Sequence, residues 1–305
     1  MLPALNRKSS IVTTGGSGFI GAHLLKALGS EAQSVSLRHP GWRKTLASIR
    51  PTAVVHLAGY AHARAPEEEI RKVNVGGTKS LAEEAVRCGV KRFIFLSSIQ
   101  AVAEKSADGD SVNTKTAATP QGAYGKSKLE AERFLRGLSM ESRMEVVIIR
   151  PPLMYAPGVK ANFRNLFQMV DNGIPLPLAA FDSNRRSFVG VSNLIELILL
   201  CLEHPAAANQ TFHVSDDEDI STAELLRRMG KALGKPVRNL PLPQSVLKTG
   251  LRLIGKGDWV DKLCGDLRVD IEETKRLLGW KPKVTMEEEL ERTAVWWKTR
   301  NDKKD

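Results

Sequence analysis

The chain has 305 residues, of which 42% are hydrophobic and 26% charged, and its formal net charge at pH 7 is +11. This length and composition suit a water-soluble α/β protein with a sizeable core and exclude a disordered chain or a small disulfide-stapled scaffold. Glu196 interrupts the longest apolar run, around residues 194–202, so we expect no segment that crosses a bilayer.

The positive charge is compatible with nucleic acid, an anionic membrane surface or phosphorylated small molecules. Lys and Arg are spread along the chain without aromatic-spaced basic clusters, so we expect no nucleic-acid partner. Cys88, Cys201 and Cys264 are far apart and indicate free thiols in a reducing compartment. Neither they nor the six histidines have metal-ligand spacing, so we expect no metal. Since nothing near the N-terminus has the pattern of a signal peptide, we expect a cytoplasmic protein.

Three glycines follow the apolar, β-branched run 11–13, namely Gly15, Gly18 and Gly21. A chain needs such glycines to leave a strand, turn sharply and bring its backbone amides close to a diphosphate at the start of a helix. The apolar spacing of residues 22–28 predicts that helix. A plain tight turn would explain the glycine pattern alone equally well, but the strand before it and the helix after it favour a dinucleotide site.

The first half of the chain alternates predicted strands and helices. Near-continuous apolar strands separated by helices favour a parallel sheet covered on both faces, a Rossmann-type doubly wound α/β fold. The predicted strands after the first are residues 34–37, 53–58, 92–96 and 146–149.

After Arg150 the composition shifts toward Pro and Gly, which indicates that the chain leaves the sheet for a smaller, C-terminal substrate-binding lobe. We expect a cofactor-binding domain of residues 1–151 plus about 187–215, and a lobe of residues 152–186 and 216–305. Within these regions the pattern predicts helices over 161–170 and 270–279, strands over 187–191 and 210–214, and helix caps at Ser192 and Ser221.

Tyr124 and Lys128 are four residues apart in a predicted helix, which places them on one face. A nearby ammonium stabilises a phenolate and makes the tyrosine a better proton-transfer group. Bare Tyr-x-x-x-Lys spacing is usually coincidental. Here the glycine turn precedes it, and Ser97 and Ser98 end a predicted strand at the carboxyl edge of the sheet, where such folds bind ligands.

Together these motifs resemble the extended short-chain dehydrogenase/reductases that act on nucleotide sugars. The likeness covers nearly the whole chain, in the segments 14–21, 56–59, 74–78, 95–98, 124–128 and 150–152. The resemblance implies that Tyr124 is the acid/base, that Lys128 holds the nicotinamide ribose and tunes Tyr124, and that Ser98 bonds the reacting sugar oxygen. Ser97 is the weaker candidate for that last role.

The resemblance also implies the rest of the binding site. The implied cofactor-binding residues are Gly15, Gly18, Phe19, Ile20, Gly21, Arg38, Leu57, Ala58, Gly59, Asn74, Tyr124, Lys128 and Pro151. The implied substrate-binding residues are Ser98, Tyr124, Asn162, Phe163 and Arg186. A second diphosphate arginine is usual near residue 260, where this chain has Val260 between Lys256 and Lys262.

Two departures from the family pattern bear on function. Where water-eliminating relatives carry Asp and Glu, this chain has Ile99 and Gln100, which cannot exchange protons, so a 4,6-dehydratase is disfavoured. Where NAD-binding relatives place an Asp on the adenosine ribose, this chain has Arg38. A guanidinium binds a 2′-phosphate in a fork, so Arg38 favours NADP(H), with NAD(H) as the other possibility.

On these motifs the first hypothesis is an NADP(H)-dependent reductase of a UDP-4-keto-6-deoxy-N-acetylhexosamine in surface polysaccharide (O-antigen) synthesis. The second is an NAD-dependent 4-epimerase of a UDP-sugar such as UDP-glucose or UDP-N-acetylglucosamine. The third is a non-catalytic NADP-binding scaffold protein. The resemblance further implies a homodimer, with the stretches around 80–87 and 129–138 as its interface.

Overall fold

The computed structural model describes residues 10–60, 65–107, 109–175, 181–237, 249 and 265–301, without the side chains of residues 161, 162, 300 and 301. Cys88 and Cys201 are free thiols, whereas Cys264 lies outside this range. In the part of the chain so described, no helix is long and apolar enough to pass through a membrane.

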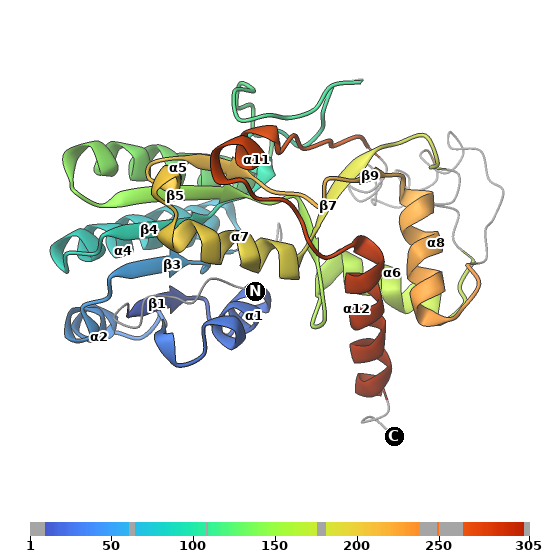
Figure 1. The fold of residues 1–305 in the computed structure, drawn as a ribbon, viewed down its shortest axis with the longest axis horizontal. Coiled ribbons are helices and arrows are strands. Elements are labelled where there is room, and N and C mark those ends of the chain that lie inside the picture. The colour runs from blue at the N-terminus through green and yellow to red at the C-terminus, as the bar shows by residue number, and fades with distance from the viewer. Residues whose placement is uncertain are drawn as a thin grey trace.

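A parallel sheet of six strands forms the centre of the molecule, in the order β2-β1-β3-β4-β5-β8 (Figure 1). Strand β2 pairs with one side of β1, and β3 pairs with the other side. The strand order therefore reverses at β1, and doubly wound sheets bind ligands at the carboxyl ends of the strands at such a switch point. The Rossmann-type prediction is confirmed. The strands are β1 (Ile11–Thr14), β2 (Ala32–Val35), β3 (Ala53–His56), β4 (Arg92–Leu96), β5 (Glu145–Arg150) and β8 (Thr211–His213).

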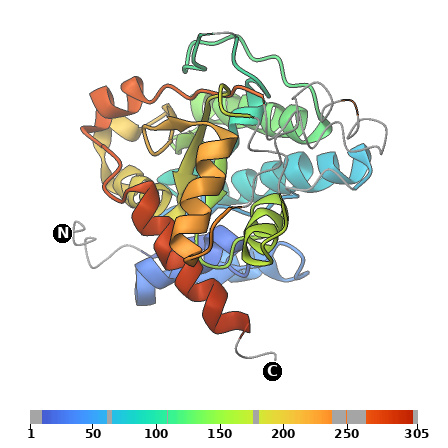
Figure 2. The ribbon, with the colours of Figure 1, turned by 90° about the vertical axis from the view of Figure 1, so that its right-hand side faces the viewer.

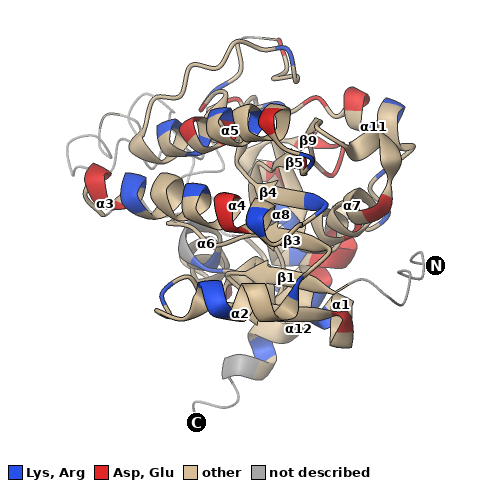
Figure 3. Ribbon diagram, turned by 90° about the vertical axis from the view of Figure 1, so that its left-hand side faces the viewer, with Lys and Arg blue, Asp and Glu red and all other residues tan. Residues whose placement is uncertain are grey.

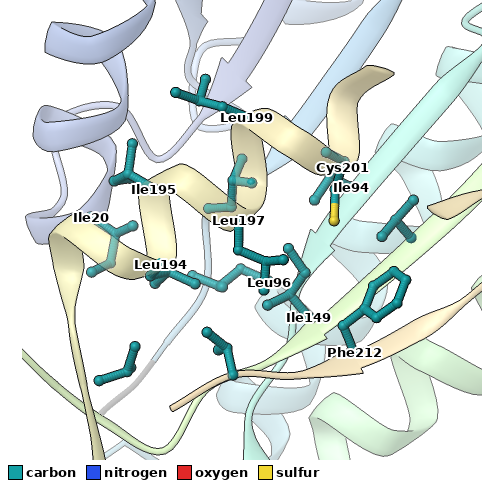
Figure 4. Packing of buried hydrophobic residues seen from close by; sticks show 14 of the residues in the cluster. Ile20, Ile94, Leu96, Ile149, Leu194, Ile195, Leu197, Leu199, Cys201 and Phe212 are labelled. Carbon is teal, nitrogen blue, oxygen red and sulfur yellow. The ribbon is translucent and has the colours of Figure 1, made fainter. Parts of the chain in front are cut away.

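Helices cover both faces of this sheet. One face packs against α1 (Phe19–Leu28) and α7 (Val191–Glu203), and the other against α2 (Trp42–Ile49), α4 (Gly77–Arg87) and α5 (Ala123–Glu141). Successive strand residues point to opposite faces, so both faces need apolar side chains. In Figure 4, Leu197 of α7 lies over Leu96 and Ile149 of the sheet, and all three are buried.

A second, three-stranded sheet stands beside the first, in the order β6-β7-β9. It is built from β6 (Leu153–Tyr155), β7 (Arg186–Gly190) and β9 (Asp219–Ile220). Three helices pack around it with their own buried cluster (Figure 2), α6 (Ala161–Asp171), α8 (Thr222–Leu233) and α12 (Met286–Asn301). The proposed division of the chain into two domains stays a prediction.

Several predicted boundaries need correction. β2 lies two residues earlier than predicted, because the chain turns at 36–39, where the His39 amide donates to the Ser36 carbonyl (3.1 Å). β3 ends at His56, not at residue 58. The prediction of Ser192 as a helix cap is wrong, since Gly190 holds that position and the Ser192 hydroxyl donates to Glu289.

Other predicted elements are confirmed. Ser221 caps α8 by accepting a hydrogen bond from the Glu224 amide (3.0 Å). The predicted helix over 270–279 is α11 (Glu272–Leu278), which ends at the left-handed Gly279. One element was not predicted. The short helix α3 (Glu67–Arg71) continues through a π-helical turn (Lys72–Gly76) into α4, and the buried Asn74 lies within this turn.

Candidate active site

The glycines between β1 and α1 are required by close backbone contacts. Gly15 has φ +75°, and a Cβ there would lie 2.8 Å from the Ala58 amide nitrogen. A Cβ at Gly21 would lie 2.1 Å from the Gly15 carbonyl oxygen, and one at Gly16 would lie 2.3 Å from the Ser34 hydroxyl. Only a chain without these side chains can turn here.

Helix α1 begins directly after this turn. Its N-cap is Gly18, which provides no side-chain cap, so the amides of the first turn are left to bind a ligand such as a diphosphate. Ile20 is buried in the core, so only its main chain can meet a cofactor. Phe19 is partly buried between the two hydrophobic clusters, and its ring meets His23 edge-on with centroids 5.8 Å apart.

A buried polar chain holds the loop after β3 beside the glycine turn. The Thr14 hydroxyl lies 2.6 Å from His56 Nδ1, and His56 Nε2 lies 2.9 Å from the Thr78 hydroxyl. Burial, reinforced by the charge of Lys128, lowers the pKa of His56 to about 3, so this imidazole stays neutral. The Leu57 amide donates to the Thr14 carbonyl (3.2 Å), which fixes Leu57 and Ala58 against the turn.

Asn74 ties the same loop to helix α5. Its Oδ1 accepts from the Tyr60 amide (2.7 Å), and its Nδ2 donates to the Tyr60 carbonyl (3.1 Å) and to the Ser127 hydroxyl (2.9 Å). A Cβ at Gly59 would lie 3.0 Å from Asn74 Oδ1 and 3.5 Å from Lys128 Nζ. Asn74 and Gly59 therefore adjoin Lys128, as expected for one continuous cofactor site.

The three predicted reacting side chains lie together. Ser98 follows β4, while Tyr124 and Lys128 occupy successive turns of α5. Burial raises the pKa of Tyr124 to about 12, and a hydrogen bond with Ser98 opposes this rise. Lys128 Nζ lies 5.9 Å from the centroid of the Tyr124 ring. A hydroxyl, a phenol and an ammonium are thus grouped at the carboxyl edge of the sheet.

Lys128 is a buried cation with few direct contacts. Its Nζ donates to the Leu96 carbonyl (2.8 Å) and lies 4.6 Å from the centroid of the Phe95 ring. Burial lowers the pKa of Lys128 to about 8, and the negative charge of Glu132 opposes that fall.

Ser97 and Ser98 have different partners, which separates their roles. The Ser97 hydroxyl donates to the buried carboxylate of Glu132, which also receives two hydrogen bonds from the Arg150 guanidinium. Ser98 faces Tyr124 and also accepts from the Gln100 amide (3.2 Å). The carbonyl of Pro151 accepts from the Ile99 amide (3.0 Å), so Pro151 lies against the Ser98 segment.

The predicted substrate residues are placed less directly. Phe163 is fully buried and stacks on Tyr155 with centroids 5.3 Å apart, so its main chain is the part able to meet a substrate. Arg186 is buried in β7 and donates to the Gly265 carbonyl (2.7 Å). The side chain of Asn162, and all of Lys256, Val260 and Lys262, lie outside the described residues.

Arg38 lies exposed after β2, close enough to Tyr60 for its charge to act on that phenol. The hydrogen bond with Glu69 raises the pKa of Tyr60, and the positive charge of Arg38 partly counteracts this rise. Arg38 is therefore free to meet an anion beside the loop that follows β3.

Comparison with known proteins places this site in a family. The model of the NAD dependent epimerase/dehydratase family matches residues 11–215, a range that includes the glycine turn, Ser98, Tyr124 and Lys128. The chain belongs to the NAD-dependent epimerase/dehydratase family. The predicted resemblance to nucleotide-sugar enzymes is confirmed. The predicted class of activity, an NAD(P)-dependent oxidoreductase or epimerase that acts on a nucleotide sugar, is confirmed as well.

Individual relatives agree with this assignment. The UDP-glucose 4-epimerase of Vibrio cholerae is 43% identical over 309 residues, which cover 93% of this chain and 94% of that protein. The fold is similar to that of the Thermotoga maritima UDP-glucose 4-epimerase solved with UDP-glucose (TM-score 0.76, 21% identity, 96% and 99% of the two chains). It also matches an Agrobacterium tumefaciens short-chain dehydrogenase/reductase solved with NAD (TM-score 0.73, 23% identity, 97% and 99%).

The residues of this family member fit the NAD that the family name implies. The close contacts at Gly15 and Gly21 leave no room for side chains beside the uncapped turn of α1, and the buried ammonium of Lys128 adjoins Gly59 and Asn74. These features can hold, in order, the diphosphate and the nicotinamide ribose.

Sequence reasoning missed several residues of this site. The buried hydrogen bonds that His56, the last residue of β3, makes with Thr14 and Thr78 have no signal in the sequence. Glu132 could have been noticed, because it lies one turn after Lys128 and beside the apolar Ala131, which is an unusual place for a carboxylate.

We predict that Gly21→Ala weakens NAD binding. The new Cβ, 2.1 Å from the Gly15 carbonyl, would force the diphosphate turn apart at an overpacking cost of about 1–3 kcal/mol. Isothermal titration calorimetry should show at least about a tenfold loss of NAD affinity. The matched control is Gly137→Ala, because Gly137 is an exposed helical glycine with nothing within 4 Å of its Cβ position. Equal NAD affinity in both variants would contradict the prediction.

Proposed function

We propose that the protein is a UDP-sugar 4-epimerase that retains one NAD through its catalytic cycle. The observation that carries the proposal is the grouping of Ser98, Tyr124 and Lys128 in a chain that is 43% identical to a UDP-glucose 4-epimerase. The sequence motifs alone favour the 4-keto-sugar reductase, but these relatives lend it no support. The complete set of reacting side chains disfavours the scaffold hypothesis.

Each of the three side chains has one task in this reaction. When bound, NAD would accept the hydride from C4 of the sugar and return it to the opposite face. Tyr124 takes the proton of the 4-hydroxyl as the hydride leaves, and gives it back when the hydride returns. Lys128, as the ammonium, stabilises the phenolate form of Tyr124. Ser98 holds the 4-oxygen by a hydrogen bond and keeps it within reach of the phenol.

We predict that Tyr124→Phe abolishes interconversion of UDP-glucose and UDP-galactose, or of their N-acetylated forms. Loss of the acid/base should lower kcat by about 10²–10⁴, the usual contribution of a positioned proton-transfer group. The measurement is a coupled epimerase assay without added cofactor. Lys126→Met is the control, since Lys126 is exposed on the same helix.

One outcome would overturn the epimerase, and another would overturn only the role given to Tyr124. If the wild type does not epimerise UDP-sugars but consumes NADPH in proportion to an added UDP-4-keto-6-deoxy sugar, the reductase hypothesis replaces it. Full turnover by Tyr124→Phe would instead show that Tyr124 is not the acid/base.

We further propose that Arg38 lets the site accept NADP(H) as well as NAD(H). The two cofactors differ by a 2′-phosphate, which an exposed guanidinium after β2 can bind through charge-assisted hydrogen bonds. Arg38→Ala should weaken NADP(H) about tenfold and leave NAD(H) nearly unchanged, as measured by fluorescence titration of the reduced cofactors. Arg43→Ala serves as the control, because Arg43 lies over the Trp42 ring, 4.6 Å from its centroid. An equal loss for both cofactors would contradict this role.

We also propose a homodimer built on α4 and α5. These helices lie side by side on the face seen in Figure 3 and carry charges of both signs, which is compatible with a two-fold contact between identical surfaces. Phe134 and Leu138 are only partly buried there. Sedimentation velocity should show a dimer that Phe134→Glu dissociates and that Ile174→Glu, on the other lobe, does not. A monomeric wild type would refute the proposal.

A further inference from the structure

The carboxylate of Glu132 is completely buried, yet the reaction described above does not use it. It receives hydrogen bonds from the Ser97 hydroxyl and from Nε and Nη2 of Arg150, and all three side chains are buried. A charged pair inside a protein is expensive to desolvate, and a well-packed apolar pair is often as stable or more so. Stability alone therefore does not account for a carboxylate at this position.

The position of Glu132 connects it to the reacting groups. Tyr124, Lys128 and Glu132 follow one another at intervals of four on α5, so they lie along one side of the helix. Ser97 adjoins Ser98 at the end of β4, and Arg150 ends β5. Through these two partners the carboxylate is held at the carboxyl edge of the sheet, one helical turn beyond Lys128.

At this location the carboxylate of Glu132 affects the charge state of Lys128. Among the described residues that act on it, Tyr124 and Glu132 come from its own helix, and His56 from β3. His56 is neutral, and the Tyr124 phenol carries no charge until it ionises. Arg150, from β5, and the exposed Arg136, from α5, are cations that pair with the Glu132 carboxylate. Glu132 is thus the standing negative charge that favours a buried ammonium at Lys128.

We propose that Glu132 is a positioning residue of the reaction: clamped by Ser97 and Arg150, its carboxylate keeps Lys128 in the ammonium form on which ionisation of Tyr124 depends. The carboxylate touches neither substrate nor cofactor in this scheme and acts through Lys128. The carboxylate bonds to Ser97 and Arg150, whereas Nζ of Lys128 donates to the Leu96 carbonyl (2.8 Å), so the two charges interact through space.

The direct test is the titration of Lys128 in the cofactor-free protein by ¹³C NMR of lysine labelled at Cε. The signal of Lys128 is identified by its absence in Lys128→Met, and its midpoint should lie near pH 8 in the wild type. In Glu132→Gln we expect the midpoint to fall by about one unit or more, because an opposite charge near a buried cation has been removed. The matched control is Glu130→Gln. Glu130 lies on the same helix as Glu132 and forms an exposed ion pair with Arg71 of α3, so its loss should leave the Lys128 midpoint unchanged.

A second readout separates this role from a merely structural one. In the epimerase assay, Glu132→Gln should move the alkaline limb of the kcat profile to lower pH by the same amount, with KM for the UDP-sugar unchanged. A purely structural role would lower kcat at every pH without moving the limb. If Glu132→Gln does not fold, the midpoint is compared between Glu132→Gln/Arg150→Gln, which leaves no unpaired guanidinium, and Arg150→Gln, which keeps the carboxylate; it should be lower in the double variant.

The kinetic part rests on the function proposed above, whereas the NMR part does not. A folded Glu132 variant with the wild-type Lys128 midpoint would overturn the inference, as would an equal shift in Glu130→Gln. An NMR shift in a protein that proves inactive on UDP-sugars would refute the epimerase and leave the role of Glu132 toward Lys128 supported.

Discussion

The structure depends on one contact, the buried polar seam between helix α5 and the carboxyl ends of strands β4 and β5. Lys128 donates to the Leu96 carbonyl, and Glu132 joins Ser97 to Arg150. Because buried polar groups are costly without partners, this seam admits one register of the helix on the sheet. That register brings the Tyr124 phenol to Ser98.

Side-chain hydrogen bonds also connect the elements on the cofactor side of the site. Asn74, inside a π-helical turn, bonds both to the main chain of Tyr60 and to Ser127 of α5. The neutral imidazole of His56 links Thr14 to Thr78 beneath it. The glycine turn, the loop after β3 and the reacting helix are therefore held to each other by side-chain hydrogen bonds, and a dinucleotide would meet a surface that is already formed.

Function in this family is decided by small differences on a shared frame. Ile99 and Gln100 carry no group that can exchange a proton, whereas Ser98, Tyr124 and Lys128 lie together at the carboxyl edge of the sheet. Arg38 lies apart from these groups, beside Tyr60, so it can influence the choice of cofactor without altering the chemistry. The fold alone distinguishes none of these activities.

The sequence by itself determined what depends on near neighbours along the chain: the glycine turn, the alternation of strands and helices, and the helical spacing of Tyr124 and Lys128. Glycine conformation and helical periodicity are local properties, so a short stretch is enough to predict them. The tertiary structure alone brought Ser97 to Glu132, buried His56, and paired Glu132 with Arg150, 18 residues away on another element. Those outcomes depend on which strands become neighbours in the sheet, and no local pattern encodes that.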